Sequence, residues 1–222
     1  MINSVVFDFN GTLFADTTAC WEADNHILKT FGGNKISLKE FRNTFSIPAI
    51  NFYSVNGCDK NGLTKDSEKL GKIFHGFYEK RAAKLRSRKN AKIVLKWLQE
   101  NGIDSVILSN HTVAGINFQL ERLGMKKYIG TLLANTALDS SMKARSKQKR
   151  LEDYIKTNSL RKEGIIIIGD TCEEIEIGRI AGIRTVAITG GYYSEARLRK
   201  GKPDFMISGL KELIGIIREI NS

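Results

Sequence analysis

The sequence predicts an α/β fold with a doubly wound parallel sheet. Short, almost wholly apolar segments alternate with longer amphipathic segments along most of the 222 residues. Continuous apolar runs are typical of parallel strands that are covered on both faces, and their alternation with helices favours a doubly wound sheet. Three polar segments follow directly on such runs, and in open sheets of this kind ligands bind at the carboxyl ends of the strands.

The expected strands are the apolar runs at residues 4–9, 105–108, 165–168 and 185–188, with a weaker one at 131–134. Amphipathic segments predict helices at residues 90–101, 113–123, 146–157 and 173–181. Gly102, Gly124 and Gly182 follow three of these helices, where a left-handed C-cap favours glycine. Beyond residues 204–207, a last helix is expected over residues 210–220.

After the first strand, the alternation of predicted strands and helices is interrupted. Roughly 70 residues pass after Leu13 before the alternation resumes near Asn90. This stretch contains two apolar stripes at helical spacing: Leu70, Ile73, Phe74, Phe77 and Tyr78 form one, and Cys20, Ala23, Ile27 and Phe31 the other. We therefore expect a core domain made of residues 1–14 and 86–222, with a helical insertion at residues 15–85. A plain structural insertion is the alternative.

Four segments carry the residues that predict chemistry. Asp8-Phe9-Asn10-Gly11-Thr12-Leu13 follows the run Val5-Val6-Phe7 and presents a carboxylate at the edge of the predicted sheet, although an Asn-Gly hairpin turn is the alternative. The second apolar run ends in Ser109-Asn110, and Lys147 opens a helix. The run at residues 165–168 leads into Gly169-Asp170, followed by Glu174.

In this order and spacing, the four segments resemble motifs one to four of the haloacid dehalogenase-like (HAD) superfamily. Residues 165–192 look most like its phosphoglycolate phosphatase-like branch, and the helical insertion matches the C1 type of cap. The resemblance implies a Rossmann-like core domain under this cap. It also implies a hydrolase of phosphoric monoesters that forms an aspartyl-phosphate on Asp8.

The resemblance also implies roles for the other residues of the site. Magnesium would be held by oxygen ligands from Asp8, the carbonyl of Asn10, Asp170 and Glu174, the last either directly or through water. The phosphate would be bound by Gly11, Thr12, Ser109, Asn110 and Lys147, with Lys143 as the alternative lysine. Ordinary structural roles stay open: helix capping for the acidic residues, a turn for the serine and a solvated side chain for the lysine. His111 could face the leaving group or serve in packing.

Asn10 departs from the phosphatase pattern, which has Asp at this position. That Asp protonates the leaving alcohol and then deprotonates the attacking water, and an amide cannot do this. Loss of a general acid–base typically costs ~10²–10⁴-fold in rate. The chain could use another proton carrier, act on substrates with good leaving groups such as acyl phosphates, or carry a substitution introduced to trap a complex.

Composition narrows the remaining possibilities. No apolar run approaches the roughly 18 residues of a membrane span, and the three cysteines form no CxxC pair, which favours a reducing cytoplasm. The net charge of +11 attracts anions, but no motif that reads nucleic acid is present. We expect a cytoplasmic monomer or homodimer acting as a magnesium-dependent phosphatase on a small phosphorylated metabolite. The alternatives are a phosphate-binding or regulatory protein with weak or no turnover, and a nucleic-acid end phosphatase.

Overall fold

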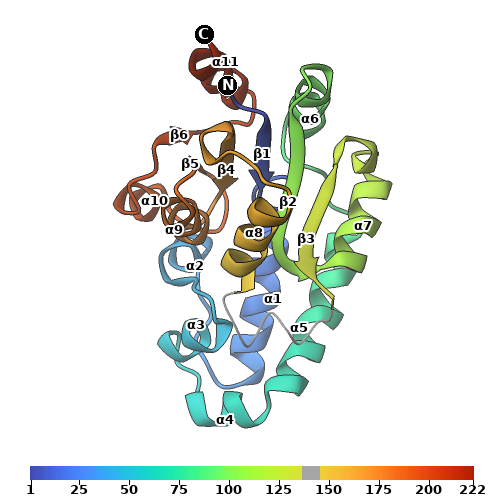
Figure 1. Ribbon diagram of the computed structural model, residues 1–222. Helices are drawn as coiled ribbons and strands as arrows, with labels where there is room; N and C mark the ends of the chain where they lie inside the picture. The colour runs from blue at the N-terminus through green and yellow to red at the C-terminus, as the bar shows by residue number, and fades with distance from the viewer. Residues whose placement is uncertain (137–145) are drawn as a thin grey trace.

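The computed structural model describes residues 1–136 and 146–222 and contains, within them, one parallel sheet (Figure 1). The strands lie in the order β3-β2-β1-β4-β5-β6, and each neighbouring pair is parallel. β1 lies between β2 and β4, so the chain winds outward from β1 in both directions. The predicted α/β fold with a doubly wound sheet is confirmed. The strands are β1 (Ser4–Phe7), β2 (Asp104–Thr112), β3 (Thr131–Asn135), β4 (Ile165–Gly169), β5 (Arg184–Ile188) and β6 (Phe205–Ile207).

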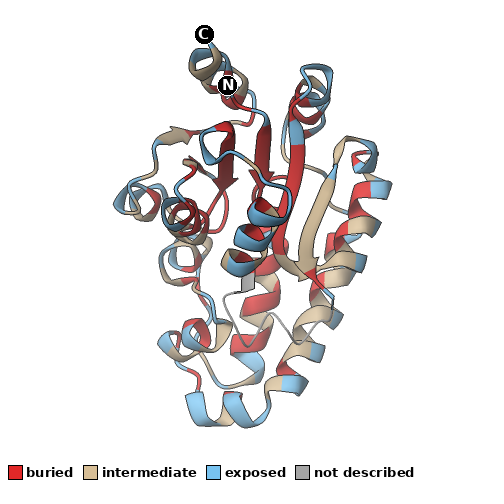
Figure 2. Cartoon of the chain, in the orientation of Figure 1, coloured by how far each residue is buried: buried red, intermediate tan, exposed pale blue. Residues whose placement is uncertain are grey.

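Helices cover both faces of the sheet, and the side chains of β1 alternate between the two cores. Val5 and Phe7 belong to the core shared with α6 (Ala91–Glu100), α7 (Val113–Arg122) and α11 (Glu212–Asn221). Val6 belongs to the opposite core, which includes side chains of α8 (Ser146–Thr157) and α9 (Cys172–Ala181). β1, β4 and most of β2 are therefore buried, as Figure 2 shows.

The predicted core helices agree with the observed ones within about two residues at each end. Gly102, Gly124 and Gly182 have φ values of 66°, 63° and 71°, which confirms the left-handed C-caps. β1 ends at Phe7, earlier than predicted, and β2 continues to Thr112 with a register shift after Leu108. Sequence reasoning did not assign β6 or α10 (Glu195–Lys200), because both are too short to show a clear period. Two 3₁₀ turns, Lys126–Tyr128 and Lys162–Gly164, precede β3 and β4.

Five helices lie between β1 and α6 and form what we call the helical insert. In Figure 1 they occupy the region beyond the carboxyl ends of the strands. Both predicted apolar stripes are helical: Ala23 and Ile27 are buried on the first helix, and Leu70 and Tyr78 on the last. The insert consists of α1 (Thr17–Thr30), α2 (Leu38–Thr44), α3 (Ala49–Val55), α4 (Lys60–Lys65) and α5 (Ser67–Ala82).

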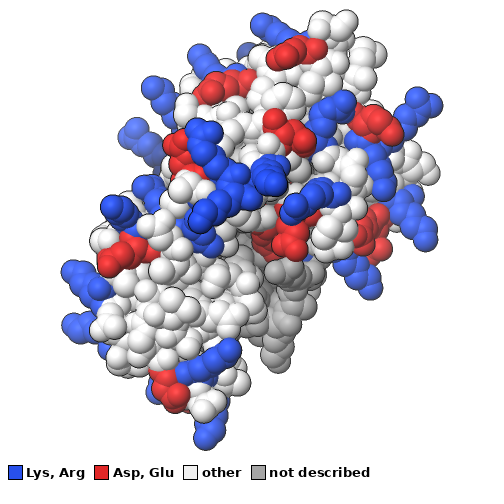
Figure 3. All heavy atoms as spheres, turned by 90° about the vertical axis from the view of Figure 1, so that its left-hand side faces the viewer, with Lys and Arg blue, Asp and Glu red and all other residues white. Residues whose placement is uncertain are grey.

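The surface is rich in basic side chains. Figure 3 shows Lys and Arg spread over one side of the molecule with Asp and Glu between them. In the described part of the chain, no helix combines the length and apolar character needed to cross a membrane.

Candidate active site

Asp8 stands directly after β1, at the carboxyl edge of the sheet. Its backbone N–H donates to the carbonyl of Ile168 (2.9 Å), so the pairing with β4 continues to this residue. The chain then turns through Gly11, whose φ of 73° suits a residue without a side chain. Because β1 pairs in parallel with β2 and β4, the Asn10-Gly11 turn does not form the hairpin considered as an alternative.

Lys147, in the first turn of α8, holds the carboxylates of this edge together. Its Nζ donates to Asp8 Oδ1 (2.7 Å) and Glu174 Oε1 (2.6 Å), and lies 3.3 Å from Glu173 Oε2. Burial alone lowers the pKa of Lys147, but Asp8, Glu174 and Glu173 together raise it well above its ordinary value, so the ammonium stays charged. The alternative lysine, Lys143, lies outside the described residues.

Asp170 lies against the loop that carries Asp8. Its Oδ1 accepts from Thr12 Oγ1 (2.9 Å), and its Oδ2 accepts from the backbone N–H of Tyr192 (2.6 Å). A Cβ at Gly11 would stand only 2.2 Å from Asp170 Oδ2, so the close approach requires glycine there. Burial raises the pKa of Asp170 to about 7, although the hydrogen bond from Tyr192 opposes the shift.

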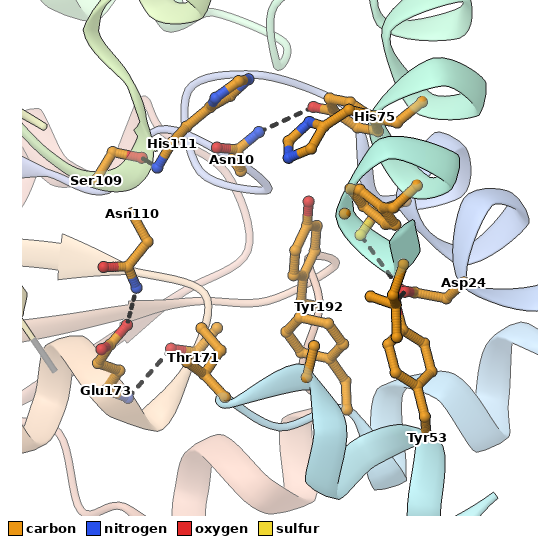
Figure 4. A pocket seen from close by; sticks show the side chains of 18 of the residues that line it. Asn10, Asp24, Tyr53, His75, Ser109, Asn110, His111, Thr171, Glu173 and Tyr192 are labelled. Carbon is orange, nitrogen blue, oxygen red and sulfur yellow. Dashed lines mark hydrogen bonds between the residues drawn. The ribbon is translucent and has the colours of Figure 1, made fainter. Parts of the chain in front are cut away.

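The end of β2 brings a hydroxyl and an amide to the same edge (Figure 4). Ser109 Oγ accepts from the backbone N–H of His111 (3.1 Å), which leaves its hydroxyl proton to donate. Asn110 Nδ2 donates to Glu173 Oε2 (3.1 Å), while Asn110 Oδ1 is buried with no hydrogen-bond partner among the described residues. The serine can therefore donate to an oxyanion placed beside Asp8.

Asn10 belongs to a polar network that the sequence did not reveal. Its Nδ2 donates to Asp16 Oδ2 (2.7 Å) and to the hydroxyl of Tyr78 (3.0 Å). The fully buried Asp16 also accepts from the backbone N–H of Gly11 (2.8 Å) and from the hydroxyls of Tyr78 (2.6 Å) and Tyr192 (2.9 Å). Because the amide of Asn10 donates a hydrogen bond, this side chain can lie beside the carboxylate of Asp16.

Gly11 and Thr12 were expected to contact phosphate, but their polar groups have protein partners. The N–H of Gly11 donates to Asp16 and the hydroxyl of Thr12 to Asp170. Neither residue lines the cavity described below. Arg88, for which the sequence carried no signal, donates to the carbonyls of Gly11 (2.6 Å) and Thr189 (2.7 Å). These contacts fix the loop after β1 in place.

A cavity of about 700 Å³ lies between the sheet edge and the helical insert. Asp8, Ser109 and Lys147 line its sheet end. Figure 4 shows Asn10 and Ser109 at one end, and Asp24 and Tyr53 of the insert at the other. Of the predicted residues, Asn10 and Asn110 also line this space, as does His111. Asp170 and Glu174 are buried and do not line it.

Two buried carboxylates, those of Asp8 and Asp170, fit a divalent cation. Burial raises the pKa of Asp8 well above its ordinary value; Lys147 opposes this, and the nearby Glu174 and Asp170 add to it. A cation would relieve that excess of negative charge, and Mg²⁺ needs only one or two protein carboxylates. Over residues 1–136 and 146–222, no three His, Cys, Asp or Glu side chains form a metal cluster. Both oxygens of Glu174 accept hydrogen bonds, from Lys147 and from Thr171 (2.7 Å), and so do both oxygens of Asp170.

Comparison with known proteins adds an independent finding. Residues 5–188 match the model of the haloacid dehalogenase-like hydrolase family. Phosphoglycolate phosphatase 1 of Pseudomonas aeruginosa is 20% identical over 214 residues, covering 95% of this chain and 78% of the relative. Pyrophosphatase PpaX of Halalkalibacterium halodurans is 21% identical over 216 residues, covering 97% of each chain.

Solved structures have the same fold. One titled as a predicted phosphatase from Clostridium acetobutylicum superposes with a TM-score of 0.82 at 17% identity, covering 99% of both chains. A haloacid dehalogenase-like hydrolase from Streptococcus pneumoniae gives 0.80 at 20% identity, covering 97% of this chain and 98% of the other. At these identities the likeness bears on the fold alone.

Proposed function

This chain belongs to the haloacid dehalogenase-like hydrolase family, and from that premise we propose that it is a magnesium-dependent phosphatase acting on a small phosphorylated metabolite. The observation that carries the proposal is the contact of Lys147 with Asp8 at 2.7 Å, between residues 139 positions apart. Two relatives named as a phosphoglycolate phosphatase and a pyrophosphatase support the same reaction class.

Asp8 is the proposed nucleophile. One oxygen of its carboxylate attacks phosphorus, the bond from phosphorus to the leaving oxygen breaks, and water later cleaves the aspartyl-phosphate. Lys147 keeps positive charge beside the nucleophile, and Ser109 donates to a phosphoryl oxygen. Asp8, Asp170 and the carbonyl of Asn10 would hold Mg²⁺, which would neutralise charge on the phosphate.

Asn10 motivates a second candidate, a phosphate-binding protein with little turnover. The residue cannot carry the proton that the leaving alcohol requires, and its amide is engaged by Asp16 and Tyr78. Metal and phosphate ligands would be unaffected by this. The second candidate predicts magnesium-dependent ligand binding without release of phosphate.

We further propose that residues 15–85, which contain the helical insert, form a cap over a core of residues 1–14 and 86–222. The insert contributes one end of the cavity, and Arg42 of α2 donates to the carbonyls of Gly191 (3.0 Å) and Gly190 (3.2 Å) in the core. The substrate would then reach the nucleophile between the two parts.

The test measures phosphate release and ligand binding together. Phosphate monoesters are incubated with the protein and Mg²⁺, and released phosphate is compared for the unchanged chain and for Asp8→Asn. Asp8→Asn should abolish release, because an amide is not a competent nucleophile. Equal release from the two proteins contradicts the proposal, and magnesium-dependent binding without release from the unchanged chain favours the second candidate.

A further inference from the structure

The two ends of the cavity differ in chemistry. The sheet end presents Asp8, Ser109 and Lys147, which suit a phosphate and a metal ion. The end formed by the insert is lined mainly by apolar and aromatic side chains (Figure 4): Phe45, Ile47, Ala49, Tyr53, Leu70 and Phe74. A volume of about 700 Å³ exceeds what a phosphate alone would fill and lies in the range of drug-sized ligands.

Apart from the lysine of the sheet end, the described lining contains one lysine, Lys72, two histidines and no arginine. Lys72 lies at the exposed rim, where its Nζ is 2.6 Å from Glu68 Oε1. His75 Nδ1 and His111 Nε2 lie 3.5 and 3.8 Å from the same oxygen, Glu79 Oε1. His75 Nδ1 has no hydrogen-bond partner among the described residues, and burial lowers the pKa of His111, which favours a neutral imidazole. Within the described lining, no Lys or Arg is therefore placed to receive a second anionic group deep in the insert.

Asp24 is the buried acid of the insert end, whereas Glu68 lies exposed at the rim beside Lys72. Its Oδ1 accepts from the hydroxyl of Tyr53 (2.6 Å), and its Oδ2 accepts from the thiol of Cys20 (3.4 Å). An anionic group brought into this end would lose its hydration and face a carboxyl instead of a cation. Burial of an unpaired charge is costly, so the lining disfavours such groups.

We propose that the substrate is a phosphate monoester with an uncharged, largely apolar leaving group, which occupies the insert end while the phosphate lies beside Asp8. This inference rests on the proposed function and narrows its substrate class. It predicts discrimination against small phosphates that carry a second anionic group, such as phosphoglycolate and pyrophosphate, although relatives of this chain are named for those compounds.

A binding series tests the inference without requiring turnover. Straight-chain alkylphosphonates, whose carbon–phosphorus bond resists hydrolysis, are titrated into the protein with Mg²⁺ by calorimetry. Each methylene that enters the apolar end should tighten binding about fourfold, until the cavity is filled. Phosphonoacetate, which carries a carboxylate in place of the alkyl chain, should bind more weakly than propylphosphonate.

Two glycines of α5 provide a matched pair of variants. Gly71 lines the cavity, and a Cβ there meets no heavy atom within 4 Å. Gly76 lies on the same helix with equally open space around its Cβ, but does not line the cavity. Gly71→Leu should therefore remove the gain in affinity of the longer phosphonates. Gly76→Leu, with the same change in helix propensity, should keep the full dependence on length.

The outcomes distinguish failure of this inference from failure of the proposed function. The inference is supported if affinity rises with the length of the alkyl chain in the unchanged protein and in Gly76→Leu, and if this rise is lost in Gly71→Leu. Binding of methylphosphonate with no gain from longer chains, or tighter binding of phosphonoacetate, overturns it while leaving the proposed phosphatase intact. Absence of binding by every phosphonate overturns the proposed function and the inference together.

Discussion

Replacing Asp24 by Asn should change how the stability of the protein depends on pH. Burial raises the pKa of Asp24 from 3.8 to about 7, even though hydrogen bonds from Tyr53 and Cys20 oppose the shift. Between these two values the folded state keeps a proton that the unfolded state has lost. The stability contributed by the protonated acid is therefore full below pH 4 and is lost as pH rises towards 7.

The size of the effect follows from the shift. About three pKa units at about 1.4 kcal/mol each give roughly 4 kcal/mol as an upper bound. Asn at position 24 cannot ionise. The free energy of unfolding of Asp24→Asn should therefore rise relative to that of the unchanged chain between pH 4 and 7, and the difference should be constant above pH 7. Using the difference between the two proteins removes the contribution of other groups that titrate in both.

Urea denaturation followed by circular dichroism at several pH values measures this difference. Asp153→Asn, an exposed position on α8, is the control and should follow the unchanged chain at every pH. A difference between Asp24→Asn and the unchanged chain that stays constant from pH 4 to 8 would refute the assignment of a protonated, buried acid.

Three further predictions concern the site. Asn10→Asp alone should add little activity, because its carboxylate would lie about 2.7 Å from Asp16 Oδ2 and share a proton with it. Adding Asp16→Asn to this variant should raise phosphate release by on the order of 10²-fold in steady-state assays. An equal rate in the single and the double variant would contradict this reasoning. Lys147→Ala should cost about 3–5 kcal/mol in urea unfolding, because it leaves buried carboxylates unpaired, and a loss under 1 kcal/mol would argue against that pairing. Gly11→Ala should lower both stability and activity, because its Cβ would meet Asp170 at a positive φ; unchanged values would show that the loop adjusts freely.

The sheet was predictable because its strands carry their own signals. Four isoleucines in a row at residues 165–168 give a strand that is buried on both faces, and left-handed glycines end the helices around it. Only short elements such as β6 were missed, since three residues cannot show a period. The position of Asp8, Ser109 and Asp170 at one edge then follows from parallel pairing.

The part of the site that depends on tertiary contacts was not predictable. Tyr78 belongs to an apolar stripe by its spacing, and nothing in the sequence shows that its hydroxyl reaches Asp16, 62 residues away. Likewise, Tyr192 and Arg88 become site residues only because the fold brings their loops to the end of β1. Asn10 looked like a missing acid, and the structure shows an amide matched to a neighbouring carboxylate.

The most direct test of the account is to look for the phosphoryl group on Asp8 itself. The protein is mixed with Mg²⁺ and a phosphate monoester, quenched in acid within milliseconds to seconds, digested and mapped by mass spectrometry. Because Asn10 cannot activate the water that cleaves the intermediate, we predict that phosphate accumulates on the peptide containing Asp8, requires Mg²⁺ and disappears in Asp8→Asn. Release of inorganic phosphate with no phosphoryl group on Asp8, or with the phosphoryl group on another residue, would contradict the central claim.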